Sequence, residues 1–271
     1  MTTLLIVGDL HINSTVAICP PEFELDDGGT YHQSPGQAWI WDNWQTFLGV
    51  TSGVKDLVTI FNGDLCEGDF KGRSDQLITR NTATIARMTS EVIDPLVKMS
   101  KAVYIIRGTE AHTGRNGALE ETIARDFDLQ GQTPNTHSWY TMLLSVSGRR
   151  FDIAHEVSGG FGTPLTRKNR ANRLAFDTLT EYADRGEKPP DFVIRSHIHG
   201  MGDSYDNHIT RGIITPCWTL ATSYVNHKAP NAIADIGAVF IHIDDRGKTD
   251  VWKFNPKPRK TQWMILPYSK N

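Results

Sequence analysis

The sequence predicts a layered α/β or α+β fold, and three patterns indicate it. Short apolar runs rich in β-branched residues are typical of buried strands, and each stops at polar or glycine-containing residues. Segments with helical spacing alternate with these runs, which is the order expected for strands and helices packed in layers. Beyond residue 209 the pattern changes to strand-like runs joined by turn residues.

In chain order, the first part of the sequence contains five expected strands and three expected helices. The strands cover residues 4–7, 57–61, 103–106, 151–154 and 192–194. The helices cover residues 36–48, 74–100 and 166–185. Later strand-like runs at 210–214, 237–243, 250–254 and 262–266 indicate a second, more antiparallel sheet. We therefore expect residues 201–271 to complete that second sheet, within a single domain spanning 1–271.

The composition limits the class of protein. The 271 residues are 39% hydrophobic and 22% charged, which is enough to bury the core of a large domain. The 28 Lys and Arg against 31 Asp and Glu give a net charge of −3, which excludes nucleic-acid binding by bulk charge alone. Three cysteines without a C-x-x-C pair, and an N-terminus without a signal-like stretch, favour a reducing cytoplasm and no membrane partner. The oligomeric state stays open.

Metal-type ligands follow all five expected strands. The segments are Gly8-Asp9-Leu10-His11, Asn62-Gly63-Asp64, Arg107-Gly108-Thr109-Glu110-Ala111-His112, His155 and Ser196-His197-Ile198-His199. The carboxyl ends of parallel strands meet at one edge of a sheet, where the loops that leave them converge. Five of the ten histidines fall in these segments. We therefore expect these side chains to form one site.

The spacing and the residue types indicate a pair of metal ions. Asp9 and His11 are two residues apart, as are His197 and His199, so each pair projects to one side of an extended chain. Asp and His ligands without thiolates suit manganese, iron, zinc or nickel, with manganese expected first. The ligands outnumber those of one tetrahedral ion, so two divalent ions are expected. Two ions about 3.5–4 Å apart can polarise a phosphoryl group and activate a water as nucleophile.

These motifs resemble the ordered signature of the calcineurin-like metallophosphoesterases, which include Mre11-type nucleases, phosphodiesterases and protein phosphatases. The resemblance covers residues 1 to about 200, in the order Asp9 with His11, Asp64, His155, then His197 with His199. It implies an αββα sandwich, with two stacked mixed sheets flanked by helices and a dinuclear site at the strand ends. It also implies the ligand sets, which are Asp9, His11 and His199 for the first metal, Asp64 as the bridge, and His155 and His197 for the second.

One motif departs from the family pattern. The family usually has Gly-Asn-His, in which Asn binds the second metal and His donates a proton or hydrogen bond to the phosphate ester. Here the segment is Gly108-Thr109-Glu110-Ala111-His112. Our hypothesis is that Glu110 replaces the Asn and that His112 takes the acid role. In the alternative, Thr109 occupies the Asn position as a weak ligand or through water. Glu67 is expected either to orient the ligands or to be a solvated loop carboxylate.

Four arginines are candidates for contacts with substrate phosphate. Arg167 and Arg170 lie in a stretch with four cations and no acid, which follows the Gly-rich residues 159–164. Glycine-rich turns before a helix present backbone N–H groups to phosphate, and Arg binds it bidentately. Arg107 and Arg115 flank the departing motif. A solvated helix face is an equally good interpretation of the basic stretch.

The expected function is hydrolysis of a phosphoester by metal-activated water, first of all a phosphodiester of nucleic acid, DNA or RNA, or of a nucleotide. A phosphomonoesterase acting on a phosphoprotein or small metabolite is the alternative within enzymes. A scaffold that has lost catalysis and binds partners is the alternative from another class, and only the altered motif at Thr109 and Glu110 supports it.

Overall fold

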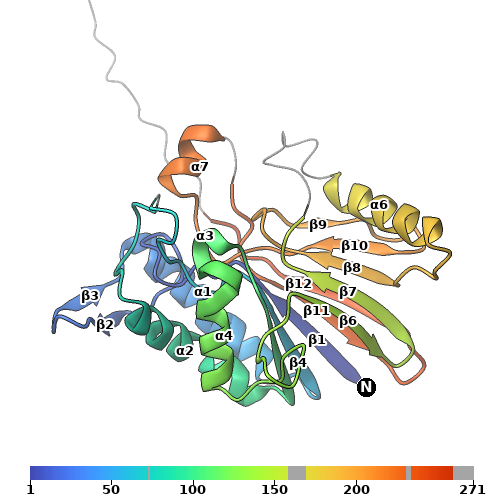
Figure 1. Cartoon of the computed structure of the whole chain (residues 1–271), viewed down its shortest axis with the longest axis horizontal. Helices are drawn as coiled ribbons and strands as arrows, with labels where there is room; N and C mark the ends of the chain where they lie inside the picture. Colours follow the sequence, from blue (N-terminus) through green and yellow to red (C-terminus); the bar gives the residue numbers. More distant parts are fainter. Residues whose placement is uncertain (73, 158–168, 230–232, 259–271) are drawn as a thin grey trace, which may run out of the picture.

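The computed structural model describes residues 1–72, 74–157, 169–229 and 233–258. Two five-stranded mixed sheets stack face to face, with helices on both outer faces (Figure 1). The first sheet has the order β12 (Thr249–Phe254), β11 (Ala238–Ile243), β1 (Thr2–Val7), β4 (Leu57–Asn62) and β5 (Ala102–Ile106). The second has the order β6 (Thr141–Val146), β7 (Arg149–Ala154), β8 (Phe192–Arg195), β10 (Arg211–Ile214) and β9 (Gly202–Asp203). A separate hairpin contains β2 (Glu22–Glu24) and β3 (Thr30–His32).

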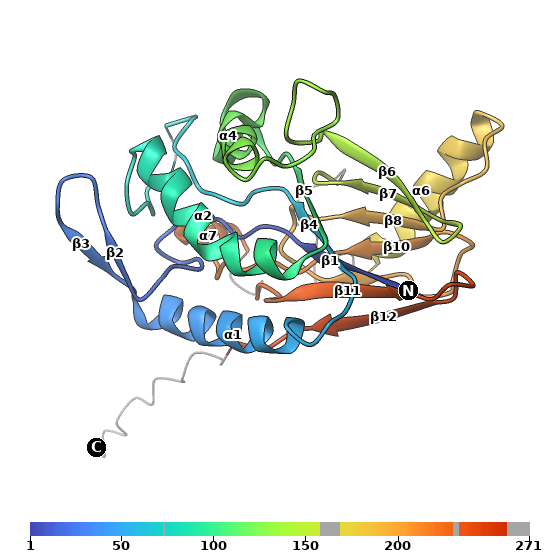
Figure 2. The same cartoon turned by 90° about the horizontal axis from the view of Figure 1, so that it is seen from below.

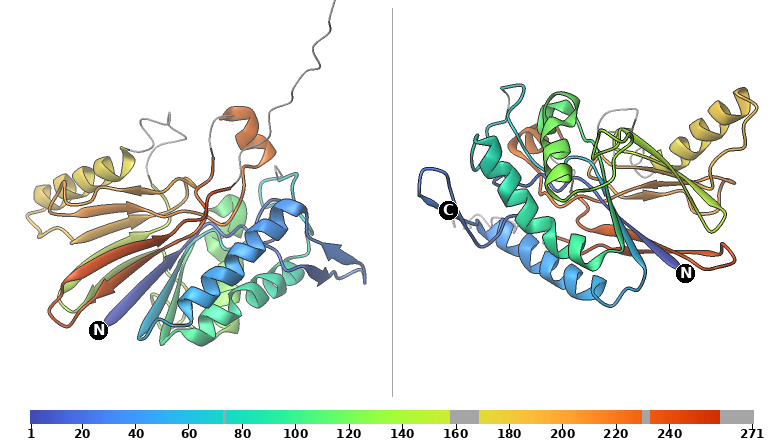
Figure 3. Two further views of the ribbon diagram at one scale, coloured as in Figure 1. Left: turned by 180° about the vertical axis from the view of Figure 1, so that it is seen from behind. Right: turned by 60° about the horizontal axis from the view of Figure 1, so that its bottom comes forward.

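The helices complete the outer layers of the sandwich. The outer face of the first sheet is covered by α1 (Pro35–Thr51), α2 (Thr82–Met99) and α4 (Ala118–Asp126), whereas α6 (Arg170–Asp184) covers the second sheet (Figure 3). Three short elements lie in loops, namely α3 (Glu110–Thr113), the 3₁₀ turn η1 (Arg115–Gly117) and α7 (Ser223–Lys228). The helix expected at 74–100 begins only at Thr82, because the Asn81 side chain accepts from the N–H groups of Ala83 and Thr84.

Strand β1 shows why the sheets stack. All five residues from Thr3 to Val7 are buried, which is typical of a central strand covered on both faces. Leu5 and Val7 pack toward the helices of the first sheet, in one core cluster. Leu4 and Ile6 pack into a second cluster, between the two sheets. The strand's period of two therefore supplies both layers of the core.

The fold class expected from the sequence is confirmed, and all five early strands are present. The expectation that residues 201–271 complete the second sheet is wrong for β11 and β12. Only β9 and β10 join that sheet, whereas β11 pairs antiparallel with β1 and carries β12 at the edge of the first sheet. The run at 262–266 lies outside the described residues. None of the helices within the described ranges is long and apolar enough to cross a membrane.

Parallel pairing places the loops that follow the parallel strands at one end of both sheets. In the first sheet β1, β4 and β5 are mutually parallel, and in the second β7, β8 and β10 are. The carboxyl ends of these strands point to the end of the sandwich opposite the N-terminus, as the view from below shows (Figure 2). The loops that follow them carry the predicted metal ligands.

Candidate metal centre

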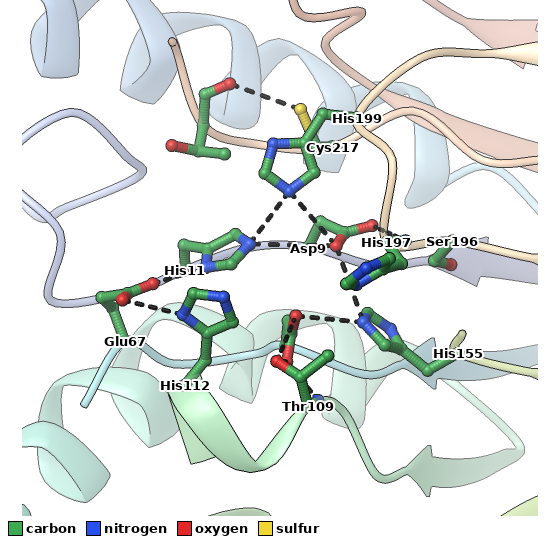
Figure 4. A network of polar contacts seen from close by, with 12 residues as sticks. Asp9, His11, Glu67, Thr109, His112, His155, Ser196, His197, His199 and Cys217 are labelled. Carbon is green, nitrogen blue, oxygen red and sulfur yellow. Dashed lines mark hydrogen bonds and ion pairs between the residues drawn. The ribbon is translucent and has the colours of Figure 1, made fainter. Parts of the chain in front are cut away.

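Six predicted ligands from both sheets gather at this end of the sandwich. They form two groups, and a third group joins His11 to Glu67 and His112. Within each group the ligand atoms lie within 4.8 Å of one another. The first group contains Asp9, His11 and His199, and the second contains Asp64, His155 and His197. The labelled side chains of both groups point toward a common centre (Figure 4). The first group contains the three residues that the resemblance implies for the first metal, and the second contains His155 and His197 together with the implied bridge, Asp64.

The backbone at five of these six residues has a left-handed conformation. The φ angles are 52° at Asp9, 45° at His11, 50° at Asp64, 72° at His197 and 50° at His199. Residues other than glycine rarely adopt positive φ, and each such residue carries a conformational cost that the surrounding structure must offset. Sharp turns directly after the strands therefore aim these side chains back over the strand ends.

Asp9 provides the clearest indication that this site suits a cation. Its carboxylate is fully buried, and Oδ2 accepts a hydrogen bond from the backbone N–H of His197 at 2.9 Å. Its Oδ1 lies 3.4 Å from Nε2 of His199, 3.8 Å from Nε2 of His11 and 3.9 Å from Nε2 of His155. Within the described residues Oδ1 has no hydrogen-bond partner. A buried carboxylate oxygen in this position fits a metal ion among the surrounding nitrogens.

The ring orientations suit metal binding as well. Nδ1 of His155 donates to the backbone carbonyl of Asn62 at 2.7 Å, which leaves the Nε2 lone pair facing the site in the neutral ring. Nδ1 of His11 is held in the same way by Oε2 of Glu67 at 2.6 Å. Nε2 of His11 then lies 3.1 Å from Nε2 of His199. Such an approach of two ring nitrogens requires a proton or a metal ion between or beside them.

The charges of the site shift the pKa values of its own members. Burial opposes charge on Asp9 and Asp64, but the neighbouring imidazoles outweigh burial and hold both pKa values well below the usual range. Burial also disfavours charge on His155, yet the charge of Asp64 raises the pKa of His155 to about 10. The pKa of His11 is raised as well, because Asp9 and Glu67 outweigh burial. At neutral pH, metal ions must therefore displace protons from these rings.

Metal uptake is expected to release protons and to tighten as pH rises. Since its pKa is about 10, His155 is protonated at pH 7 in the metal-free protein and must lose that proton before Nε2 binds an ion. We expect the affinity for Mn²⁺ to rise by up to about tenfold per pH unit between pH 6 and 9, with about one to two protons released per chain. Calorimetry in two buffers of different ionisation enthalpy measures the release. An affinity independent of pH would contradict this account.

Glu67 links His11 to the predicted acid, His112. Oε2 of Glu67 contacts Nδ1 of His11 at 2.6 Å, and Oε1 contacts Nδ1 of His112 at 2.8 Å. The two imidazole rings stand edge to face, 4.7 Å apart. The buried Asn13 side chain donates to the backbone carbonyl of Glu67 at 2.7 Å and fixes this loop. The sequence suggested an orienting role for Glu67, whereas it gave no signal for Asn13, whose contact depends on two loops meeting.

In the departing motif, Thr109 contacts a candidate metal ligand, whereas Glu110 lies away from both groups. Thr109 donates to Oδ1 of Asp64 through its backbone N–H at 2.7 Å, and its hydroxyl lies 3.1 and 3.2 Å from the two carboxylate oxygens. Glu110 is exposed and accepts from the backbone N–H of Asn116 at 3.3 Å. The structure places Glu110 outside both ligand groups, so our hypothesis that it replaces the Asn ligand finds no geometric support.

Thr109→Asn is expected to strengthen the second group. Asp64, His155 and His197 offer three ligand atoms, and an amide oxygen at position 109 would supply a fourth. We expect the dissociation constant of the weaker Mn²⁺ site to fall about tenfold, measured by calorimetry on metal-free protein. Thr109→Val is the matched control, because it removes the hydroxyl next to Asp64 and should weaken binding. Unchanged affinity in both variants would place residue 109 outside the metal centre.

Glu120 is a buried residue that the sequence analysis missed. Its two carboxylate oxygens accept from the backbone N–H groups of Leu65, at 3.0 Å, and Gly108, at 2.6 Å. It thereby joins the loop after β4 to the loop after β5. Burial, followed by the charge of Asp64, raises the pKa of Glu120 to about 7. Only glycine fits at position 108, since a Cβ there would lie 2.1 Å from Oδ1 of Asp64.

The four candidate arginines lie in different surroundings. Arg107 is engaged elsewhere, with Nε on the hydroxyl of Ser138 at 2.7 Å, an ion pair to Glu121 at 3.0 Å and Tyr140 under its guanidinium. Because its guanidinium already has these partners, the expected role of Arg107 at the phosphate stays a prediction that the structure does not support. Arg115 is exposed in η1, just after His112. Arg170 lines a surface groove with Glu156, next to His155 in the chain. Arg167 and the Gly-rich residues 159–164 lie outside the described residues.

Comparison with solved structures finds partial likenesses at low sequence identity. Wild-type Vps29 from Entamoeba histolytica, in complex with Zn²⁺, is 12% identical, with a TM-score of 0.46 over 94% of this chain and 99% of that one. Vps29 from Chaetomium thermophilum is also 12% identical, with a TM-score of 0.46 over 95% of this chain and 98% of that one. The sequence matches no protein-family model and no curated protein. The functional conclusion therefore depends on the site's own geometry.

Proposed function

We propose that this protein is a dinuclear metal-dependent phosphoesterase that hydrolyses a phosphodiester of a nucleic acid or nucleotide. One observation carries the proposal: two groups of three ligand atoms, each within 4.8 Å, meet around the buried carboxylates of Asp9 and Asp64. Oδ1 of Asp9, which has no hydrogen-bond partner among the described residues, and the facing imidazole nitrogens require positive charge between them, as protons or as metal ions. Two divalent cations would supply that charge in place of the protons.

In this proposal each group would hold one ion, and Asp64 would serve both. The ligands are Asp9, His11 and His199 for the first ion, and Asp64, His155 and His197 for the second. Bound ions would polarise the phosphoryl oxygens and lower the pKa of a water, which supplies the nucleophile. The chain itself fixes the imidazole orientations through the Asn62 carbonyl and Glu67, so that little reorganisation is needed when ions bind. Manganese is the expected metal, with iron, zinc and nickel as alternatives.

His112 is positioned to serve the leaving group. Its side chain is 31% exposed, whereas those of His11 and His155 are almost fully buried, so it can reach a bound substrate. Glu67 holds its Nδ1, which leaves Nε2 to donate a proton or hydrogen bond to the ester oxygen. This arrangement supports the acid role, with His112 displaced by two residues from the usual position in the motif.

We also propose a nucleic-acid or nucleotide substrate and a cytoplasmic location. Arg115 and Arg170 can contact phosphates locally, so DNA, RNA or a nucleotide can bind despite a net charge of −3. All three cysteines are free and buried, which fits a reducing cytoplasm. Neither point depends on the likeness to Vps29.

A substrate panel with Mn²⁺ tests the function. The panel contains bis-p-nitrophenyl phosphate, p-nitrophenyl phosphate, and single- and double-stranded DNA. We expect turnover of the diester and of DNA above that of the monoester. Faster turnover of the monoester would make the protein a phosphomonoesterase with the same metal centre. Protein that binds two ions and hydrolyses none of the four would be a metal-binding scaffold, contrary to the proposal.

A further inference from the structure

The four edges of the two sheets are not alike. Edge strand β9 has two residues, and its Asp203 is paired with Lys253 of the other edge strand β12 at 2.6 Å. These two edges therefore lie against each other and carry charge. The third edge, β5, is covered by Trp139. The backbone N–H of Trp139 donates to the carbonyl of Ile105, and its backbone carbonyl accepts from the backbone N–H of Arg107. Charge, shortness and cover are the usual means by which proteins prevent edge-to-edge pairing.

The fourth edge, β6, has none of these protections. It is six residues long, contains no charged residue and no proline, and pairs with β7 on one side. Among the described residues no strand pairs with its other side, and Figure 2 shows it at the outer margin of the second sheet. Leu143, in the middle of the strand, is 73% exposed. An open, uncharged, partly apolar edge of this length is a template for another strand.

We propose that β6 pairs antiparallel with β6 of a second copy of this chain, about a two-fold axis at Leu143. Met142 faces the core between the sheets and Leu143 faces outward, so only registers that keep the two faces matched are allowed. In the register centred on Leu143, this residue lies opposite Leu143 of the second copy. Met142 of each copy then lies opposite Leu144 of the other, and Thr141 lies opposite Ser145. Apolar residues then meet apolar ones, and hydroxyls meet hydroxyls.

This self-complementarity selects a second copy over an unrelated strand. A two-fold interface requires each residue to suit its symmetry mate, and no like charges face each other here because β6 has none. The pairing joins two second sheets into one continuous sheet of ten strands across the axis. The proposal is independent of the phosphoesterase activity, since it uses no residue of the metal centre.

Sedimentation equilibrium and cysteine cross-linking test this proposal. We expect the wild type to have twice the chain mass of 30.3 kDa at micromolar concentration. Leu143→Lys should raise the dimer dissociation constant at least tenfold, and metal content and circular dichroism should stay unchanged. Ile209→Lys is the matched control, because Ile209 is 81% exposed and lies outside the strands, so this variant should stay dimeric.

Cross-linking reports on the register itself. The three native cysteines are buried, so Leu143→Cys adds the one exposed thiol in the part of the chain that the structure describes. Directly opposed residues bring their Cβ atoms to about 4.5–5.5 Å, and mild oxidation should link Leu143→Cys into a dimer at least tenfold faster than Ile209→Cys. Equal rates, a monomeric wild type, or a dimer that survives Leu143→Lys would overturn the proposal.

Discussion

Asp64→Asn is expected to lower turnover of the best substrate by about three orders of magnitude, roughly 4 kcal/mol of transition-state stabilisation. The same change should reduce bound Mn²⁺ from two ions per chain to at most one. Asp64 is buried, belongs to the group with His155 and His197, and receives both the N–H and the hydroxyl of Thr109. An amide in its place removes the shared negative charge and one ligand oxygen. Steady-state kinetics with parallel elemental analysis measures both effects.

Asp206→Asn is the matched control for that variant. Asp206 is exposed in the turn between β9 and β10, outside both ligand groups. It should keep two ions and wild-type turnover. If Asp64→Asn retained turnover within a few-fold of wild type, the bridging role of Asp64 would be wrong, whatever its metal content.

His112→Ala is expected to lower kcat by about two to three orders of magnitude while leaving two ions bound. The loss is expected because His112 faces the site next to His11 and is held by Glu67, but belongs to neither proposed ligand set. Its effect should therefore be largest for substrates with poor leaving groups, such as DNA, and smallest for p-nitrophenyl esters. A kinetic comparison across the panel measures this difference.

Glu110→Gln separates the two interpretations of the departing motif. Because Glu110 is exposed and bonded to the backbone of Asn116, this variant should match the wild type in turnover and metal content. If instead Glu110→Gln lost one ion while His112→Ala stayed active, the ligand role of Glu110 would be restored and the acid role of His112 would fail.

The candidate ligands could be picked out from the sequence because each follows a buried strand at a short distance. Parallel pairing brings Asp9 near Asp64 at one end of the first sheet and His155 near His197 at the same end of the second, and the stacking of the two sheets joins these pairs. The position of Glu110 away from both groups has a local cause. Thr109 ends the extended segment and α3 begins at Glu110, and residues two apart on a helix face different directions, so Glu110 and His112 cannot both face the site.

Other features depend on contacts that no local pattern encodes. The runs that became β11 and β12 were recognisable as strands, but their pairing with β1 rather than with the second sheet depends on the path of the whole chain. Asn13 and Glu120 act by joining loops that are distant in sequence, and each is an ordinary polar residue in its own segment. Burial and partners, rather than residue type, mark them as part of the site.

The proposed two-metal centre is built from Asp9, His11, Asp64, His155, His197 and His199. It is tested by the metal content of the wild type, measured by elemental analysis after reconstitution with Mn²⁺ and removal of free metal at pH 8. We expect two ions per chain for the wild type and at most one for Asp64→Asn. A wild type that holds no metal under these conditions would contradict it.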